Sequence, residues 1–163
     1  MCDDAWHPAE TVQRGLGALE DSRFAFEFVT HGEKWSAAMM NEFPLVIVAK
    51  ANHLYATDQR AWLTAEVQPA FPQFVRRGGG LLLVHAGTCY KDLPEMRGLM
   101  GGAFLSHPDQ CPVAIEPKPG HALTAGVNSF AARDEHYVMA LDAADADVFL
   151  HRSEEHTSEL QSL

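Results

Sequence analysis

The sequence lacks three features: the long apolar run of a membrane-spanning protein, the cysteine framework of a disulfide-rich or metal-clipped protein, and the excess of basic residues of a protein that binds nucleic acid or anionic membranes. Its apolar runs stay far below the ~18–20 residues of a membrane-spanning helix, and no basic-then-apolar start marks a signal peptide. The three cysteines, Cys2, Cys89 and Cys111, are too few and too scattered for a disulfide framework or a CxxC metal clip. These absences predict a cytoplasmic protein with reduced thiols.

Basic residues are scarce relative to acidic ones. The chain has 12 lysines and arginines against 22 aspartates and glutamates, which gives a formal net charge of −10. We therefore expect binding neither to nucleic acid nor to an anionic membrane surface. The acidity fits a neutral or cationic small molecule, and equally a charge that only keeps the protein soluble. Homo-oligomer formation stays open.

The most informative stretch is a glycine-rich break followed by an apolar strand that ends on a histidine. Glycines occupy positions 78–80, and residues 81–84 are apolar without polar alternation. That pattern is typical of a parallel strand buried on both faces. His85 follows, on a turn for which Gly87 supplies backbone freedom. Because ligands bind beyond the carboxyl ends of strands in open α/β sheets, His85 is the first candidate site residue.

The rest of the chain alternates helical and strand patterns. Apolar spacing predicts helices at residues 9–19 and 93–100 and a helix at 59–75 interrupted by Pro69 and Pro72, with a short helix or turn at 35–40. Strands are predicted at residues 24–29, 44–49, 81–85, 113–115, 130–133 and 148–150. At 163 residues, this order predicts one α/β domain with a doubly wound, mainly parallel sheet.

Both ends of the sequence predict truncation. Residues 3–10 have the composition of a strand-to-helix loop, yet only Met1 and Cys2 precede them, so a first strand is expected and missing. We expect this to leave a central slot or an exposed strand edge. Residues 152–163 include RSEEHTSELQS, which resembles the in-frame translation of a common sequencing-adapter oligonucleotide. We therefore predict a truncated domain over 1–151 and an artefact tail over 152–163 that packs against nothing.

Polar residues gather where the predicted strands end. His7 follows the missing strand, Lys50 and Asn52 follow the strand at 44–49, and His85 follows the strand at 81–85. Since parallel strands place their carboxyl ends on one rim of the sheet, these groups are expected to converge, with His7 and His85 as neighbours.

Five short motifs occur in the order that is typical of ThuA-like proteins, which are named for trehalose utilisation. They lie at residues 3–10, 78–87, 100–104 with 107–108, 121–126 and 134–137, and the resemblance covers roughly residues 3–151. It implies a class I glutamine-amidotransferase-like, flavodoxin-like fold and a role in carbohydrate catabolism. True amidotransferases carry a nucleophilic cysteine at the strand-to-helix elbow, where this chain has His85. An active glutamine amidotransferase is therefore not expected.

Imidazole and carboxylate groups together allow two chemistries in such a protein. They can act as general acid and base on a trehalose-like sugar or keto-sugar, or they can hold a divalent metal such as zinc, so the cofactor stays open. The predicted catalytic residues are His85, His7 and Glu135, and the candidate metal ligands are His7, His85 and His107. The predicted substrate-binding residues are Asp4, Lys50, Asn52, His107 and Tyr137.

Two functional readings follow from these residues. The first is a sugar-metabolising enzyme that is active in its full-length form, with the 163-residue chain expected to be inactive. The alternative is a non-catalytic sugar- or partner-binding module on an amidotransferase-like scaffold. Single residues also have structural alternatives: His85 can satisfy its own loop, and Asp3 or Asp4 can cap the helix that follows.

Overall fold

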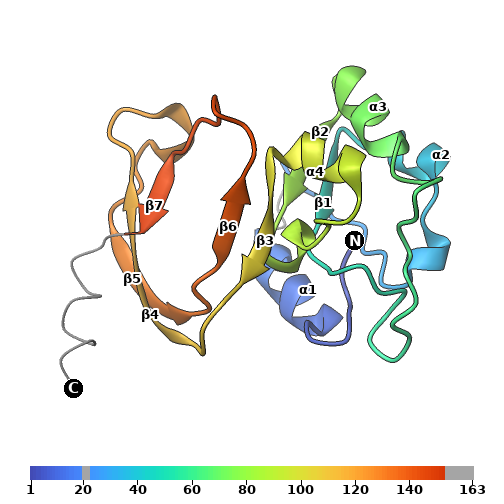
Figure 1. Cartoon of the computed structure of the whole chain (residues 1–163), viewed down its shortest axis with the longest axis horizontal. Helices are drawn as coiled ribbons and strands as arrows, with labels where there is room; N and C mark the ends of the chain where they lie inside the picture. Colours follow the sequence, from blue (N-terminus) through green and yellow to red (C-terminus); the bar gives the residue numbers. More distant parts are fainter. Residues whose placement is uncertain (20–22, 153–163) are drawn as a thin grey trace. The chain divides into compact units, whose positions relative to one another are not determined.

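The computed structural model describes residues 1–19 and 23–152, which belong to two compact units. The first unit, Met1–Phe104, combines helices with a small parallel sheet, and the second begins at Leu105 and consists mainly of strands (Figure 1). The chain is thus of mixed α/β class, as the sequence predicts. In the described part of the chain, no helix has both the length and the apolarity needed to cross a bilayer.

The secondary-structure elements of the first unit are short. In chain order they are α1 (Ala9–Gly17), η1 (Gly32–Lys34), α2 (Ala37–Met40), β1 (Leu45–Val48), α3 (Ala70–Arg76), β2 (Gly80–Leu83), η2 (His85–Thr88) and α4 (Pro94–Met100). Proline at the first position of α4 and the left-handed Gly101 (φ 68°) at its end explain its bounds. β3 (Gly102–Ser106) then crosses into the second unit.

β1 and β2 form the parallel pair that the two apolar runs predict. Leu45 lies opposite Gly80 and Val48 lies opposite Leu83. The carbonyls of Pro44 and Val48 accept hydrogen bonds from Gly80 and Val84 at the two ends of this pair. Both strands therefore end at the same edge, which places the residues that follow them side by side.

The hydrophobic core of the first unit lies where the α3 region and α4 meet the strands. It is centred on aromatic rings: Trp35 stacks on Phe71 with ring centroids 5.3 Å apart, and Trp62 meets Phe71 edge-on at 6.0 Å. Phe71 is fully buried, and burial of such a side chain contributes about 1.5–3 kcal/mol. This core fixes the rim on which the polar residues sit.

The helix predicted at 59–75 is largely wrong, because only Ala70–Arg76 is helical. Pro69 occupies the N-cap position of α3, so the helix begins just after it. Upstream, the side chain of Asn52 donates to the Leu63 carbonyl and accepts from the Leu63 N–H, both at 2.9 Å. These two bonds hold the preceding segment in turns and compete with helical bonding.

The strand predicted at 24–29 is also wrong, although its residues are extended. Its neighbour in space is Cys2, whose N–H donates to the Val29 carbonyl at 3.1 Å. No ladder forms at residues 24–28 with any described segment of the chain. The alternating phenylalanines thus have the sequence of a strand, but among the described residues they do not join a sheet.

The second unit departs from the predicted, mainly parallel sheet. β4 (Cys111–Pro117) lies between β5 (Phe130–Asp134) and β7 (Leu150–Arg152), and both pairs are antiparallel. The connection from β4 to β5 spans residues 118–129 and contains η3 (Ala122–Thr124). β6 (Val138–Leu141) was not expected from the sequence. The predicted strand at 148–150 begins two residues later, at Leu150.

The predicted artefact tail begins inside this last strand. Arg152 is opposite Ile115 in the β4–β7 pair. Residues 153–163 lie outside the described residues, so the expectation that the tail packs against nothing stays a prediction.

Candidate functional site

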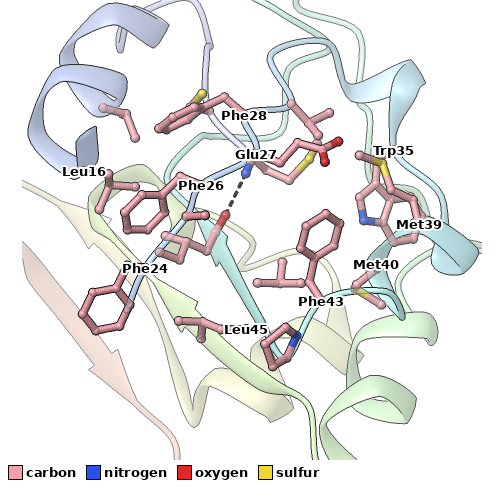
Figure 2. A pocket seen from close by; sticks show the side chains of 18 of the residues that line it. Leu16, Phe24, Phe26, Glu27, Phe28, Trp35, Met39, Met40, Phe43 and Leu45 are labelled. Carbon is pink, nitrogen blue, oxygen red and sulfur yellow. Dashed lines mark hydrogen bonds between the residues drawn. The ribbon is translucent and has the colours of Figure 1, made fainter. Parts of the chain in front are cut away.

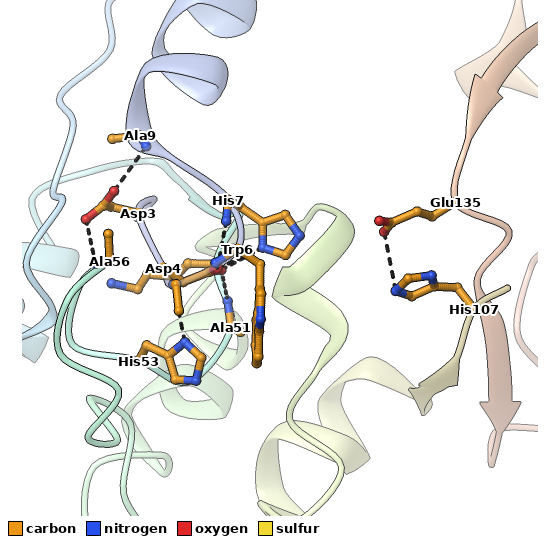
Figure 3. Close-up of polar contacts among 12 residues, drawn as sticks. Asp3, Asp4, Trp6, His7, Ala9, Ala51, His53, Ala56, His107 and Glu135 are labelled. Carbon is orange, nitrogen blue, oxygen red and sulfur yellow. Dashed lines mark hydrogen bonds and ion pairs between the residues drawn. The ribbon is translucent and has the colours of Figure 1, made fainter. Parts of the chain in front are cut away.

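The loop before α1 is shaped by two aspartates with different partners. Asp3 has a left-handed backbone (φ 78°), and its carboxylate accepts the N–H of Ala9 at 3.1 Å and that of Ala56 at 2.9 Å. It therefore caps the start of α1 and ties it to the loop that contains Ala56 (Figure 3). The capping role that the sequence left open between the two aspartates belongs to Asp3.

Asp4 is a buried carboxylate that is fully engaged by hydrogen bonds. Its oxygens accept the backbone N–H groups of Trp6 (2.8 Å), His7 (2.9 Å) and Ala51 (2.7 Å), and both lie within 2.9 Å of the His7 Nδ1 atom. Burial disfavours its charge, but these hydrogen bonds and the nearby His7 outweigh burial and lower the pKa of Asp4 to about 2. Since Ala51 follows β1, Asp4 also fastens this loop to the rim of the sheet.

The contact with Asp4 sets the tautomer of His7. An ionised carboxylate only accepts hydrogen bonds, so the Nδ1 of His7 must carry the proton. In the neutral imidazole, Nε2 is then the acceptor. The side chain of His7 is 26% exposed, so this nitrogen belongs to a ring that solvent or a ligand can reach. A carboxylate behind a histidine is the arrangement that raises imidazole basicity in catalytic and metal-binding sites.

His85 lies beside His7, as the sequence predicts for the two strand ends. The centroids of the two imidazole rings are 4.8 Å apart, with an angle of 57° between the ring planes. His85 is exposed, opens η2 directly after β2, and adopts a left-handed backbone (φ 51°). That conformation costs a non-glycine residue about 1–2 kcal/mol. The turn is held by the Thr88 hydroxyl, which donates to the His85 carbonyl at 2.8 Å.

The turn after β2 requires glycine at position 87, because there is no room for a side chain. A Cβ at this position would lie 2.0 Å from the Val48 carbonyl oxygen. Only glycine therefore lets η2 pass so close to the end of β1. The sequence predicts this glycine for a tight turn, and the structure adds close backbone approach as the physical reason.

Lys50 and Asn52 have contacts that sequence analysis did not reveal. The Lys50 ammonium is fully buried and donates to the carbonyls of Leu54 (2.9 Å) and Thr30 (3.3 Å). Burial lowers its pKa to about 8, although Asp3, Asp4 and Cys2 oppose the shift. Asn52 holds Leu63, as described above. Both side chains are thus engaged within the first unit, and their predicted contact with a substrate stays a prediction.

Trp6 and His53 are neighbours of the site that the sequence did not single out for a role. The Trp6 ring lies 4.7 Å from the His53 ring and 6.5 Å from the His7 ring, and Trp6 is 66% exposed. His53 accepts the Ala5 N–H through Nδ1 at 3.4 Å. The sequence feature that could have indicated a role for Trp6 is its position directly before His7 in a loop.

The other predicted site residues lie in the second unit and form a group of their own. The Nε2 atom of His107 is 3.6 Å from a Glu135 oxygen, and its ring stacks on Tyr137 with centroids 5.7 Å apart. The Nδ1 atom of His107 lies 2.8 Å from the Pro108 carbonyl, which fixes that nitrogen as a donor. The structure therefore brings His107, Glu135 and Tyr137 together. Grouping them with His7 and His85 stays a prediction.

Two imidazoles at the rim of the first unit suit either of the expected chemistries. His7 and His85 supply two nitrogen ligands of the kind that zinc prefers, and Asp4 stands in the position of a supporting carboxylate. The same pair suits proton transfer, since one ring has its tautomer fixed by Asp4 and the other lies against it.

Comparison with known proteins identifies the family. A family model described as ThuA, trehalose utilisation, matches residues 4–161, which is most of the chain. The match extends into the residues attributed to an adapter sequence, and that attribution stays a prediction. No curated protein and no solved structure matches the chain. The extent of the family match shows that the chain belongs to the ThuA (trehalose utilisation) family.

Proposed function

We propose that this protein is an enzyme of carbohydrate catabolism that acts on a sugar or keto-sugar, with His7 as its general base. The observation that supports the proposal is the arrangement of Asp4, His7 and His85. The buried Asp4 carboxylate accepts a hydrogen bond from the Nδ1 atom of His7, and the centroid of the His85 ring lies 4.8 Å from that of the His7 ring. The family description, trehalose utilisation, supports the substrate class.

The chemistry follows from the tautomer of His7. Its Nε2 atom accepts a proton from a sugar hydroxyl or from the carbon beside a keto group. The Asp4 carboxylate then stabilises the resulting imidazolium, as the aspartate of a catalytic triad does. Proton transfer of this kind typically accelerates a reaction about 10²–10⁴-fold. His85 is placed to donate a hydrogen bond to the developing oxyanion, or to share a divalent metal with His7.

Trp6 adds a surface suited to a sugar. Its exposed indole ring provides a broad apolar face together with an N–H donor, next to the loop that carries His7. A pyranose likewise has an apolar face bordered by hydroxyl groups. We propose that the substrate packs against Trp6 while one of its hydroxyls meets His7.

Three finer expectations belong to the same proposal. The first unit follows the flavodoxin-like, doubly wound plan, supported by its parallel β1–β2 pair and by the polar residues that follow both strands. The protein works in the cytoplasm on a small-molecule sugar. Glu135, His107 and Tyr137 contribute to the reaction or to substrate binding, supported by the carboxylate–imidazole contact between the first two.

The test is turnover of trehalose and of 3-keto-disaccharides by the protein expressed from its complete gene, beside the 163-residue chain. We expect His7→Gln and His85→Ala each to reduce kcat/KM at least 100-fold while leaving the unfolding midpoint nearly unchanged. His31→Gln is the matched control, because His31 is a histidine whose contacts are with Thr30 and Tyr55.

Metal removal separates the two chemistries. Loss of activity after dialysis against a chelator, restored by Zn²⁺ in the parent but not in His85→Ala, assigns His85 to a metal. Activity that survives chelation assigns both histidines to proton transfer. Sugar binding without turnover in every form of the protein would contradict the enzyme and favour the alternative, a non-catalytic sugar-binding module.

A further inference from the structure

The first unit contains an apolar cavity of about 330 Å³ beside β1, which has the size of a ligand-binding pocket. The segment with Phe24, Phe26 and Phe28 forms one wall, and Phe43 and Leu45 lie on another, as Figure 2 shows. A sugar carries many hydroxyl groups, and these would give up their hydrogen bonds with water on entering such a lining. The cavity therefore does not suit the proposed substrate, and contacts for a sugar are expected at the polar rim instead.

At this rim, the indole of Trp6 is largely exposed, but the backbone that carries it is fixed. The N–H of Trp6 donates to the Asp4 carboxylate at 2.8 Å, and the same oxygen lies 2.8 Å from the Nδ1 atom of His7. One carboxylate thus holds both the exposed aromatic residue and the candidate base. Because this loop is already ordered, a ligand that packs on Trp6 loses little free energy to ordering it.

The imidazole of His53 lies against the Trp6 ring, with ring centroids 4.7 Å apart and an angle of 52° between the planes (Figure 3). The backbone N–H of His53 donates to the Ala51 carbonyl at 2.8 Å. Its side chain is held as well, because Nδ1 accepts the N–H of Ala5 at 3.4 Å. Both the backbone and the ring of His53 are therefore anchored, so the ring supports the indole beside it.

The contact with Ala5 sets the tautomer of His53. Since Nδ1 accepts a hydrogen bond it carries no proton, so Nε2 is the N–H donor. His7 has the opposite arrangement, in which Nδ1 donates and Nε2 is the acceptor. Within residues 1–19 and 23–152, no group accepts a hydrogen bond from the Nε2 atom of His53, and this atom is not buried. A donor is thus available to a ligand directly beside Trp6.

We propose that His53 determines the specificity of the sugar site: its Nε2–H donates a hydrogen bond to one hydroxyl oxygen of the sugar that packs on Trp6. The inference rests on the proposed function for its substrate class. A hydroxyl group both donates and accepts hydrogen bonds, so the acceptor on His7 and the donor on His53 suit two different hydroxyls of one sugar. An analogue without the second hydroxyl leaves the His53 donor unpaired and binds more weakly.

The experiment measures equilibrium binding of trehalose and of its monodeoxy analogues, each of which lacks one hydroxyl group, by isothermal titration calorimetry. The reference protein and all variants carry His7→Gln, so that turnover does not consume the ligand. His53→Phe keeps an aromatic ring beside Trp6 but removes the donor, whereas His53→Gln keeps an N–H donor. His31→Phe is the matched control, because the ring of His31 likewise lies against an aromatic ring, that of Tyr55, with centroids 4.6 Å apart.

We expect one monodeoxy analogue to bind the reference protein about three- to tenfold more weakly than trehalose does. His53→Phe should bind that analogue and trehalose equally, His53→Gln should recover part of the difference, and His31→Phe should leave it unchanged. Trehalose should also change the tryptophan fluorescence of the reference protein, and Trp6→Phe should remove this change. Lost packing alone would weaken all ligands alike, so a difference that disappears for a single analogue identifies the donor.

Discrimination that survives in His53→Phe would overturn the proposal, and so would the absence of trehalose binding both in the reference protein and in the protein that retains His7. Failure of the enzyme proposal has a different signature. Trehalose binding that depends on His53, without turnover by the protein that retains His7, contradicts the enzyme alone. Turnover that requires His7, with full discrimination in His53→Phe, contradicts the role of His53 alone.

Discussion

At the scale of single residues, the Asp4 carboxylate has both a structural role and a contact with a candidate catalytic residue. One carboxylate binds three backbone N–H groups and the imidazole of His7, so it shapes the loop and sets the tautomer of a candidate base at once. Its pKa of about 2, below the usual 3.8, shows that the folded state stabilises the charged form. Structure and proposed chemistry therefore depend on the same group.

The pH dependence of stability tests this role. A carboxyl group with a lowered folded-state pKa contributes stability that is present above its unfolded value near 3.8 and is lost as the pH falls toward about 2. The shift corresponds to roughly 2 kcal/mol. We expect Asp4→Asn to destabilise the protein at neutral pH and to flatten the decline of the unfolding free energy between pH 4 and 2, measured by urea denaturation.

Asp92→Asn is the matched control for this experiment, because Asp92 is exposed and lies outside the loop. It removes one negative charge without touching the hydrogen bonds of Asp4. If both variants keep the acid sensitivity of the parent, the proposed contribution of Asp4 is wrong.

Some of the candidate site was accessible from the sequence and some was not. His7 and His85 were placed together because each follows the expected end of a strand, and the rings are indeed 4.8 Å apart. The contacts of Lys50 were not accessible, because its carbonyl partners, Thr30 and Leu54, are brought to it only by tertiary folding. Strand ends follow from local patterns, whereas the partners of a buried side chain depend on the whole unit.

At the scale of elements, the contact between η2 and β1 positions the histidine pair. Gly87 passes so close to Val48 that a Cβ would overlap its carbonyl oxygen. The end of β1 and the turn after β2 are therefore locked together, and His85 opens that turn. The position of His85 depends on a glycine two residues away.

Substitution of Gly87 tests this dependence. We expect Gly87→Ala to lower the unfolding free energy by about 2 kcal/mol or more, since the backbone must shift to accept the new methyl group. The imidazole resonances of His85 should shift with it in NMR spectra. Gly98→Ala is the control: a Cβ added at Gly98 in α4 would meet no atom within 4 Å beyond the backbone of its own helix, so alanine should stabilise the helix by about 0.5–1 kcal/mol. Equal effects of the two substitutions would contradict the close approach.

The incorrect element predictions have physical causes of the same kind. Residues 24–29 alternate as a strand does, but a strand also needs a neighbour, and in the described part of the chain no ladder forms at residues 24–28, while Cys2 donates to Val29. The helix expected from 59 starts at Ala70, because Asn52 holds Leu63 from a distant part of the chain and Pro69 sets the first turn. In both cases long-range hydrogen bonds, which a local pattern does not contain, decided the outcome.

At the scale of the whole molecule, burial is unevenly distributed between the two units. Among the described residues, every fully buried hydrophobic side chain lies between Cys2 and Ala103. In the second unit, all residues of β5 and of β7 are exposed. Since buried apolar contacts supply most of the stability of a domain, the two units are expected to differ in local stability.

Limited proteolysis measures that difference. A protease specific for aromatic and large aliphatic residues is expected to cut at Phe130 and Leu141, which are 51% and 65% exposed, before it cuts at Phe71 and Phe74 in the core. The early cuts need no more than local opening of the second unit, whereas the later ones need the core of the first unit to unfold. Mass spectrometry of a time course should thus show a persistent fragment that retains α3, β2 and α4. Simultaneous cutting at all four positions would show that the units unfold together, and the separate core of the first unit would then not be the main source of stability.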